Sequence, residues 1–293
     1  MHRILHMSVV SVCLAMLLAI TALCAPARAE HATIRFGILP VLDTLPLQVA
    51  ARQGLFAEHG LNVELVPFSS ALERDTAMQA GRLDGFFGDL VPTFLLLDAG
   101  VPLRIALVSW RSTPGYPMFA VLTSPQNAGA SVKQLKGRTL GISTATIIEY
   151  LLDAMEAEQG LEAPFKRVEI KKIPIRLQML LSGQLDMALL PEPLVSLTRD
   201  KGGAVLMTDE NLDIPVTVLC LSDRFFEGDA AAYAGFVAAW HDAVKLLRTD
   251  PEAWRGLMAE TCRIPPPLAE DFPIYPYPDP SLPSVAELED VQD

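Results

Sequence analysis

Cysteine and histidine are scarce, and their spacing excludes the commonest disulfide and zinc architectures. The 293-residue chain has four cysteines and five histidines. Beyond residue 24 the cysteines are Cys220 and Cys262, too few for a disulfide-stapled small domain and wrongly spaced for a zinc site with paired cysteines. These two thiols either form one disulfide or stay separate and buried, and spacing alone leaves both possibilities open.

Catalytic and phosphate-binding motifs are also missing. His31, His59 and His241 are isolated, with no second histidine at metal-binding spacing. The chain has no nucleophile elbow, no dinucleotide-binding glycine loop and no phosphate loop. Residues brought together by folding could still catalyse a reaction. The sequence nevertheless favours a binding protein over an enzyme, and we expect no catalytic residue, no metal ligand and no cofactor.

Positive charge is in short supply. The chain has 23 Lys and Arg against 35 Asp and Glu, a formal net charge of −12. Such a chain is repelled by phosphate backbones and anionic lipid headgroups, so we expect no nucleic-acid partner and no binding to membrane surfaces. The charge of a small ligand is not constrained, because a buried cleft has its own local field.

Long apolar runs are absent after the N-terminal region. Arg3, the apolar run 8–23 and the small residues Ala27-Arg28-Ala29 have the layout of a secretory signal peptide, which predicts cleavage after Ala29. Cys24 would carry a lipid anchor instead, but the bulky Leu23 before it disfavours that alternative. No later segment has the length of a transmembrane helix. We therefore expect residues 1–29 to be removed and the rest to be an exported, soluble protein.

One α/β pattern occurs twice, about a hundred residues apart. A helical run ends at Gly60-Leu61, a strand follows, and a second helix ends in Gly81-Arg82-Leu83-Asp84 before an apolar strand. The same order appears from Gly160-Leu161 to Gly183-Gln184-Leu185-Asp186. Alternating strands and helices predict a mostly parallel sheet flanked by helices. The repetition predicts two such lobes with a cleft between them.

The domain boundaries follow from two strands that stand outside the repeated pattern. Near 118–123 and 215–222 the chain is expected to cross between the lobes and form a hinge. Lobe one then comprises residues 30–119 and 216–293, and lobe two residues 120–215. Eight prolines between Pro265 and Pro283 predict an extended strap, without regular structure, on a lobe surface. Residues 285–292 have helical spacing.

Ligands of open parallel sheets bind beyond the carboxyl ends of the strands. That rule selects the segments 39–44, 88–90, 110–116, 143–146 and 191–193. In the first, Leu39, Pro40, Asp43 and Thr44 are candidate ligand contacts, although Asp43 or Thr44 could instead cap the next helix. In the second, Gly88 and Asp89 are candidates, and Asp89 could equally be a helix cap.

The last two segments carry polar groups suited to different ligands. Ser143, Thr144 and Thr146 stand at a helix start, where hydroxyls and free N–H groups could bind a carboxylate, sulfonate or phosphate, or one hydroxyl could only cap the helix. Glu192 lies between two prolines. Its carboxylate suits a ligand with amino or amidine N–H groups, or could be a surface or capping acid.

Aromatic side chains near strand ends could stack on a ligand. Trp110, Tyr116 and Phe87 have that position, although such aromatics also serve as ordinary core. Arg111 could pair with an anionic ligand or remain solvated.

The segments 46–50 and 53–64, with Gly54-Leu55-Phe56 and Gly60-Leu61-x-Val63, resemble the opening of periplasmic solute-binding proteins of ABC importers. The branch is the one that handles sulfonates, taurine, nitrate and the pyrimidine precursor of thiamine. The resemblance implies a two-lobed type II fold that closes on one small molecule. Family contacts would correspond here to the loop from Pro40 to Thr44, Gly88 and Asp89, residues 143–146, and Glu192.

The leading hypothesis is therefore a monomeric solute-binding subunit that delivers a small organic molecule to an ABC permease in the inner membrane. Glu192 favours an aminopyrimidine-like ligand, whereas the hydroxyl-rich helix start favours a sulfonate or carboxylate, and the sequence leaves this choice open. The alternatives are an enzyme on the same fold, related to thiamine-pyrimidine synthesis, and a periplasmic sensor subunit.

Overall fold

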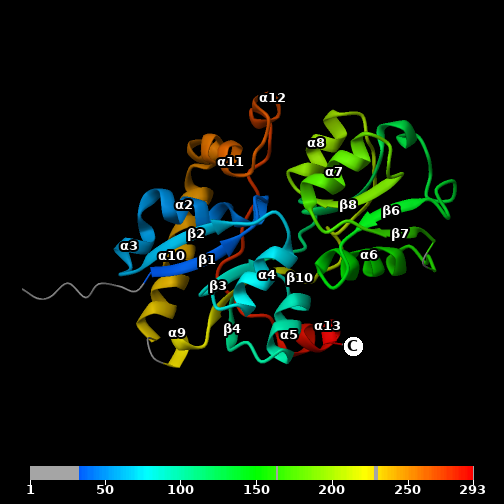
Figure 1. The fold of residues 1–293 in the computed structure, drawn as a ribbon. Helices are drawn as coiled ribbons and strands as arrows, with labels where there is room; N and C mark the ends of the chain where they lie inside the picture. The colour runs from blue at the N-terminus through cyan, green and yellow to red at the C-terminus, as the bar shows by residue number, and fades with distance from the viewer. Residues whose placement is uncertain (1–32, 163, 228–229, 293) are drawn as a thin grey trace, which may run out of the picture. The chain divides into compact units, whose positions relative to one another are not determined.

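Two five-stranded sheets organise the chain, and each has helices packed against it (Figure 1). The structure, a computed structural model, describes residues 33–162, 164–227 and 230–292. From Thr33 onward the chain forms one compact unit. The predicted signal peptide, Cys24 and His31 lie outside the described residues.

The two sheets have the same strand order, which is the structural form of the repeat seen in the sequence. The first sheet has the order β2-β1-β3-β10-β4, with β1 (Thr33–Ile38), β2 (Asn62–Pro67), β3 (Gly85–Gly88), β4 (Leu103–Arg111) and β10 (Pro215–Ser222). The second has the order β7-β6-β8-β5-β9, with β5 (Phe119–Thr123), β6 (Thr139–Ile142), β7 (Lys166–Glu169), β8 (Met187–Pro191) and β9 (Val205–Thr208).

We call the first sheet and its helices lobe one, and the second sheet and its helices lobe two. The helices of lobe one are η1 (Leu42–Thr44), α2 (Leu45–Gln53), α3 (Leu55–Glu58), α4 (Ala71–Gln79), α5 (Leu90–Asp98), α9 (Arg224–Glu227), α10 (Ala230–Thr249), η3 (Pro251–Trp254), α11 (Arg255–Thr261), α12 (Pro266–Ala269) and α13 (Val285–Gln292). Those of lobe two are η2 (Pro125–Asn127), α6 (Ile147–Glu158), α7 (Ile173–Leu181) and α8 (Leu194–Asp200). Among the described residues no helix is both long and apolar enough to span a bilayer.

Both sheets contain parallel and antiparallel strand pairs, whereas the sequence pattern predicted mostly parallel sheets. β1 pairs in parallel with β2 and β3, and β6 pairs in parallel with β7 and β8, as the alternating pattern predicted. β10 is antiparallel to β3 and β4, and β5 is antiparallel to β8 and β9. The antiparallel strands are the two that lie at the predicted crossings. They are not linked to their neighbours by a βα crossover, so nothing requires them to run in parallel.

Equivalent residues stabilise equivalent turns in the two lobes. α4 and α7 are followed by Gly81 and Gly183, whose φ angles of 66° and 75° place them in the left-handed region that ends a helix. Asp84 then accepts a hydrogen bond from Arg35 N, and Asp186 accepts one from Thr139 N. The repeated Gly-x-Leu-Asp sequence thus ties each second helix to the first strand of its own sheet.

In the second unit the strand after Gly160-Leu161 is β7 at Lys166–Glu169, and α7 begins at Ile173, because Pro174 is tolerated in the first helical turn. One prediction about regular structure was wrong. The proline-rich stretch 265–283 was predicted to lack regular structure, but it contains the short helix α12. The helix predicted at 285–292 is confirmed as α13.

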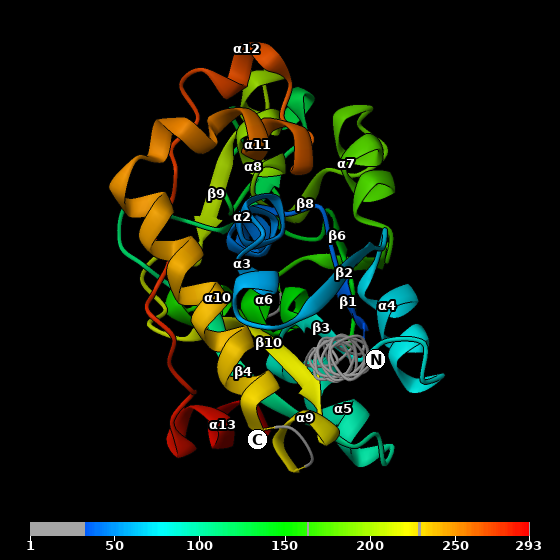
Figure 2. The same ribbon diagram turned by 90° about the vertical axis from the view of Figure 1, so that its left-hand side faces the viewer.

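The proline-rich stretch is also buried more deeply than a surface strap would be. Tyr275 and Tyr277 are 5% and 1% exposed. The Tyr275 hydroxyl donates to Pro117 O at 2.7 Å, and the Tyr277 hydroxyl donates to Leu42 O at 2.6 Å. These bonds fasten the returning chain beside the first crossing and beside η1. Figure 2 shows the long helix α10, which packs on α2, in front of the sheet of lobe one.

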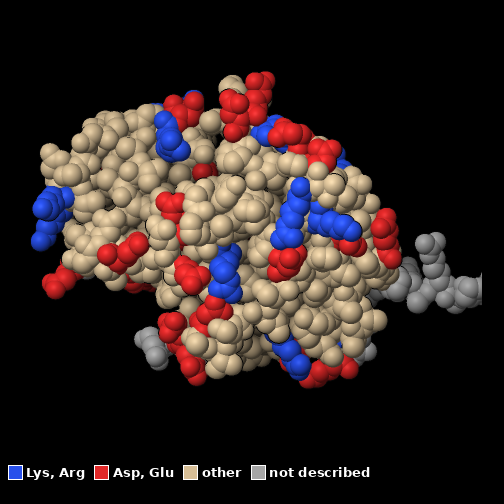
Figure 3. All heavy atoms as spheres, turned by 180° about the vertical axis from the view of Figure 1, so that it is seen from behind, with Lys and Arg blue, Asp and Glu red and all other residues tan. Residues whose placement is uncertain are grey.

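Charged side chains of both signs are interspersed over the described residues of the face in Figure 3, which has no continuous basic area.

Candidate functional site

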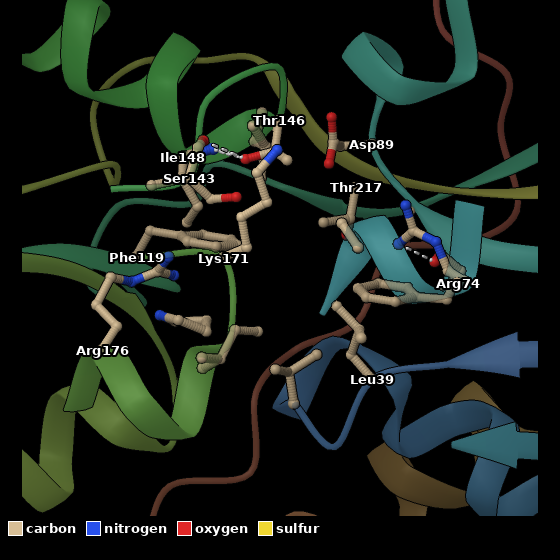
Figure 4. Close-up of a pocket in the computed structure, with 17 residues that line it drawn as sticks. Leu39, Arg74, Asp89, Phe119, Ser143, Thr146, Ile148, Lys171, Arg176 and Thr217 are labelled. Atoms are coloured by element: carbon tan, nitrogen blue, oxygen red, sulfur yellow. Dashed lines mark hydrogen bonds between the residues drawn. The ribbon is translucent and has the colours of Figure 1, made fainter. Parts of the chain in front are cut away.

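A cavity lies between the lobes, and we call it the interlobe cavity (Figure 4). Lobe one contributes residues from the loop before η1, from α4, β3 and β10, and from the cap of α5, namely Leu39, Val41, Ala71, Arg74, Phe87, Gly88, Asp89 and Thr217. Lobe two contributes residues from β5, β8 and the starts of α6 and α7, namely Phe119, Ser143, Thr146, Ile147, Ile148, Lys171, Ile173, Arg176 and Pro191. The walls are largely apolar, with a few polar and charged groups set into them, as in typical ligand sites.

The cavity brings together five of the residues predicted from the strand-end rule, because both sheets point their carboxyl ends toward it. Leu39, Gly88, Asp89, Ser143 and Thr146 all line it. The predicted stacking residue Phe87 lines it as well. Their contact with a ligand stays a prediction.

Direct contacts between the lobes close the cavity. Leu42 N donates to Glu192 O at 3.2 Å, and Ile173 N donates to Ser69 O at 3.4 Å. Lys172 Nζ lies 2.9 Å from Glu73 Oε1. A surface ion pair of this kind stabilises by about 1 kcal/mol at most.

Thr146 forms the cap of α6 that the sequence offered as one interpretation. Its Oγ1 accepts from Ile148 N at 3.2 Å and donates to Ser143 O at 2.8 Å. Glu149 accepts from Ala145 N at 2.9 Å, which completes the helix start. Thr144 points elsewhere: it is exposed, lines a neighbouring groove, and its N donates to Glu169.

Asp89 also serves as a helix cap while it lines the cavity. Its Oδ1 accepts from Val91 N at 3.1 Å at the start of α5. Burial raises the pKa of Asp89 to about 7, against the opposing effects of the Arg74 charge and of the N–H groups of Ile147 and Val91. The Ile147 N–H belongs to lobe two, so this carboxyl faces the start of α6.

Glu192 lies next to the cavity wall, but its carboxylate is engaged with α8. Oε2 accepts from Ser196 N at 3.0 Å, and Oε1 accepts from the Ser196 hydroxyl at 2.9 Å. Burial raises the pKa of Glu192 to about 7, partly offset by these bonds. The neighbouring Pro191 lines the cavity, whereas Glu192 is not among its lining residues. A ligand role for this acid stays a prediction.

The remaining predicted contacts lie behind the wall or beside it. Asp43 is fully buried and accepts from Thr217 Oγ1 at 3.0 Å, so it reaches the cavity only through Thr217. Thr44 donates to Leu39 O and Val41 O within its own loop and makes no side-chain cap of α2. Pro40 lines a separate groove with Phe68 and Leu194.

Two of the three aromatic candidates, Trp110 and Tyr116, pack against the proline-rich stretch. Trp110 is fully buried, with its ring 5.4 Å from that of Tyr275 and 5.9 Å from that of Tyr277. Tyr116 is 36% exposed and packs edge-on against Tyr275. Arg111 forms an ion pair with Glu287 of α13. None of the three is among the lining residues of the interlobe cavity.

Sequence reasoning missed two arginines that the structure places in opposite walls of the cavity, Arg74 on α4 and Arg176 on α7 (Figure 4). Both are almost completely buried. A signal was available: each stands seven residues before the glycine of the repeated Gly-x-Leu-Asp. Buried arginines at equivalent positions of a repeat are expected to have equivalent places in the fold.

Gly141 leaves room for the Arg176 side chain to pack across β6, and replacing this glycine gives a testable prediction. A Cβ on Gly141 would lie 2.6 Å from Leu185 Cδ1 and 3.2 Å from Arg176 Cγ. We expect Gly141→Ala to lower the free energy of unfolding by about 1–3 kcal/mol, because an extra methyl in a packed core forces its neighbours to shift.

The matched control is Gly129→Ala in the same lobe, where a Cβ meets no atom within 4 Å. Urea denaturation of both variants measures the difference. Equal stabilities would show that the Leu185 and Arg176 side chains adapt freely.

The described residues contain no group of three or more His, Cys, Asp or Glu side chains arranged to hold a metal ion. Cys220 and Cys262 are both free and buried, so the disulfide alternative does not apply. Burial raises the pKa of each thiol to about 12, which leaves both unreactive.

Comparison with known proteins agrees with this architecture. Residues 27–263 match the sequence profile of the NMT1-like family. The chain belongs to the NMT1-like family. The alkanesulfonate-binding protein SsuA from Xanthomonas axonopodis pv. citri bound to MOPS has the same fold, with a TM-score of 0.74, 21% identity, and coverage of 90% of this chain and 91% of that one. This NMT1-like protein therefore has the two-lobed fold of periplasmic binding proteins.

Two curated relatives are similar over part of this NMT1-like chain. The bicarbonate-binding protein CmpA of Synechococcus elongatus is 30% identical over 127 residues, which cover 42% of this chain and 27% of that protein. The nitrate import ATP-binding protein NrtC of the same organism is 32% identical over 109 residues, 36% of this chain and 15% of that protein. The matches thus span about a quarter or less of each relative's length.

Proposed function

We propose that this NMT1-like protein is the extracytoplasmic solute-binding subunit of an ABC importer. It captures one small organic molecule in the interlobe cavity and presents it to a permease. The observation that carries the proposal is the cavity itself, which both lobes line and which direct contacts between the lobes close. A ligand held by both lobes favours the closed form over the open form by the difference in its affinity for the two.

The relatives support the class of function. SsuA is an alkanesulfonate-binding protein and CmpA a bicarbonate-binding protein, while NrtC is the ATP-binding protein of nitrate import. These names indicate binding of small anions and work with ABC transporter components. Because they describe transport proteins, we propose binding without catalysis, in a monomer that meets its permease in the inner membrane.

The hinge follows from the strand topology. β5 and β10 are the strands at which the chain passes from one sheet to the other, and each lies between two neighbours in its new sheet. We propose the lobe boundaries 30–119 and 216–293 against 120–215, with closure about these two crossings. Asp209 joins the crossings, because its Oδ1 accepts from both Met118 N and Phe119 N. We further propose that export to the periplasm removes residues 1–29.

The experiment that tests the function identifies the ligand from the protein itself. The chain from residue 30 onward is purified and denatured, and released small molecules are identified by mass spectrometry. The compounds found, together with sulfonates, carboxylates and aminopyrimidines, are then ranked by thermal shift. A ligand at a hundred times its Kd should stabilise the protein by about 2.7 kcal/mol, a rise in Tm of about 5–10 °C.

A variant that fills the cavity without changing its charged groups tests whether the ligand binds there. Ala71 lines the cavity on α4, so Ala71→Phe is expected to abolish the thermal shift. Ala57→Phe places the same ring on the exposed side of α3 and should leave the shift intact. A shift that persists in Ala71→Phe would place ligand binding outside the interlobe cavity.

A further inference from the structure

Arg74 and Arg176 have equivalent packing positions in the two lobes. Arg74 and Arg176 are 1% and 0% exposed. A Cβ on Gly37 of β1 would lie 2.7 Å from Leu83 Cδ1 and 3.1 Å from Arg74 Cγ. A Cβ on Gly141 of β6 would meet Leu185 and Arg176 at 2.6 and 3.2 Å. Each arginine therefore crosses the first strand of its sheet over a glycine, with the leucine of Gly-x-Leu-Asp beside it.

Lobe one supplies the counter-ion of its own arginine. Asp75, the next residue on α4, accepts at Oδ1 from Arg74 Nε at 2.8 Å and from Nη2 at 2.6 Å. Arg74 Nη1 donates to Phe87 O at 2.6 Å. All three nitrogens of this buried guanidinium have partners, so its charge is compensated inside the lobe.

Lobe two has no such counter-ion, because Leu177 stands where lobe one has Asp75. Arg176 Nη1 donates to Ile170 O at 2.9 Å, just after β7, whereas Arg74 Nη1 donates to Phe87 O in β3. Arg176 Nε and Nη2 have no hydrogen-bond partner among the described residues. These are the two atoms whose counterparts in Arg74 bind the Asp75 carboxylate. A buried guanidinium with two unpaired donors is strongly destabilising unless an anion reaches it.

The other charges around the cavity are accounted for. Lys171 Nζ lies 3.5 Å from Glu169 Oε1. Asp89 is on the lobe-one side, where the charges that act on it are those of Arg74 and Asp75. The acid that acts on Arg176 is Glu169, which is 37% exposed and makes no hydrogen bond to it. Figure 4 shows the Arg176 guanidinium directed from α7 into the cavity, near Phe119.

We propose that the ligand is a small organic oxyanion whose charged head binds Nε and Nη2 of Arg176, in the place that the Asp75 carboxylate occupies in lobe one. This inference rests on the proposed solute-binding function and specifies its ligand class. Planar, two-donor recognition is the geometry in which a guanidinium binds carboxylates and other oxyanions. The Ser143 hydroxyl lies in the same wall and adds a neutral donor. Leu39, Phe119 and Ile148 cover an apolar body.

The ligand class thus favours one of the two alternatives that the sequence left open. An aliphatic sulfonate or carboxylate satisfies Arg176. An uncharged aminopyrimidine offers neither the negative charge nor a pair of acceptor oxygens, and a cation is repelled.

The test compares charge selectivity in matched variants by isothermal titration calorimetry. The probes are butanesulfonate, butyrate and nitrate, with uncharged butanol and cationic butylamine as controls. Wild type should bind at least one anion about 100-fold more tightly than butanol or butylamine. Arg176→Gln should lose about 100-fold in affinity for that anion and lose the preference for charge.

Leu177→Asp is the decisive variant, because it gives lobe two the carboxylate that lobe one has at Asp75. It should pair internally with Arg176 and weaken the anion about 100-fold, whereas the uncharged Leu177→Asn should stay within about threefold of wild type. Circular dichroism shows whether each variant is folded. If Arg176→Gln fails to fold, the Leu177 pair alone decides.

Two results would overturn the inference while the proposed function stands. One is tighter binding of butanol, butylamine or an aminopyrimidine than of any anion by the wild type. The other is equal anion affinity in Leu177→Asp and Leu177→Asn. A wild type that binds no probe and releases no small molecule on denaturation would contradict the proposed function, and the inference would fall with it.

Discussion

Replacing Trp110 with alanine is expected to lower the free energy of unfolding by about 3–5 kcal/mol and to leave ligand affinity within about threefold. The indole is 0% exposed and packs against Tyr275 and Tyr277 of the proline-rich stretch. Its Nε1 has no hydrogen-bond partner among the described residues, so the loss is one of packing and of the cavity left behind. Urea denaturation measures the stability, and calorimetry of the folded variant measures the affinity.

The control is Tyr116→Ala, which removes a ring that is 36% exposed and packs on the same Tyr275. Its expected cost is about 1 kcal/mol, because most of the effect of truncation depends on burial. The opposite pattern for Trp110→Ala, near-normal stability with a tenfold or greater loss of affinity, would restore Trp110 as the stacking contact that its sequence position suggested.

Stability is expected to fall as the pH rises from about 5 to 8, by several kcal/mol in total. Burial raises the pKa values of Asp43, Asp89, Glu192 and Asp209 to about 7 in each case. In the unfolded chain these carboxyls release their protons near pH 4. Between these values the folded state holds more protons than the unfolded state, so the free energy of unfolding decreases with rising pH.

The sign reverses only in strong acid. The hydrogen bond from Arg111 lowers the pKa of Glu287 to about 2, and the stability from that ion pair is present above the unfolded pKa and lost as the pH falls toward 2. Stability from the four buried acids is full below about pH 4 and lost as the pH passes through 7. The optimum is therefore expected near pH 5.

Asp209→Asn removes the contribution of one of these four carboxyls to the pH dependence of stability. The asparagine oxygen can keep the two bonds from Met118 N and Phe119 N, because both are made to Oδ1 while Oδ2 has no partner among the described residues. Urea denaturation at pH 5, 6, 7 and 8 should show a slope that is shallower than in wild type by about 1.4 kcal/mol per pH unit between pH 5 and 6, with the difference fading as the pH passes 7. Asp98→Asn removes an exposed acid and is the control. Parallel slopes for Asp209→Asn and wild type would mean that Asp209 stays ionised when folded.

The repeat made the fold predictable, since it is written in local signals. Gly81 and Gly183 end helices because glycine adopts the left-handed conformation at little cost, and apolar strands follow both. Such signals depend on a few neighbouring residues, so they can be recognised in the sequence without knowing which strands pair. They did not predict that β5 and β10 run antiparallel to their neighbours, because those pairings join residues far apart in the sequence, such as Val218 and Val108.

The strand-end rule selected segments, and the structure decides which of their side chains face the cavity. Ser143, Thr146 and Asp89, which the rule selected, line one cavity, and their contact with a ligand stays a prediction. The rule also selected Glu192, whose carboxylate the structure shows bound to Ser196 at the start of α8. A rule about strand ends locates a backbone position. The rotamer and hydrogen-bond partners, which decide what a side chain faces, come from packing.

Arg176 illustrates which features the sequence determined and which only the tertiary structure decided. The sequence by itself determined that two similar α/β units exist, that each carries an arginine seven residues before its Gly-x-Leu-Asp, and that aspartate follows one arginine and leucine the other. Only the tertiary structure decided that both guanidinium groups are buried at the same cavity and that one has its carboxylate while the other does not. Burial and ion pairing depend on atoms contributed by distant segments, and a guanidinium is uncompensated only in relation to everything packed around it.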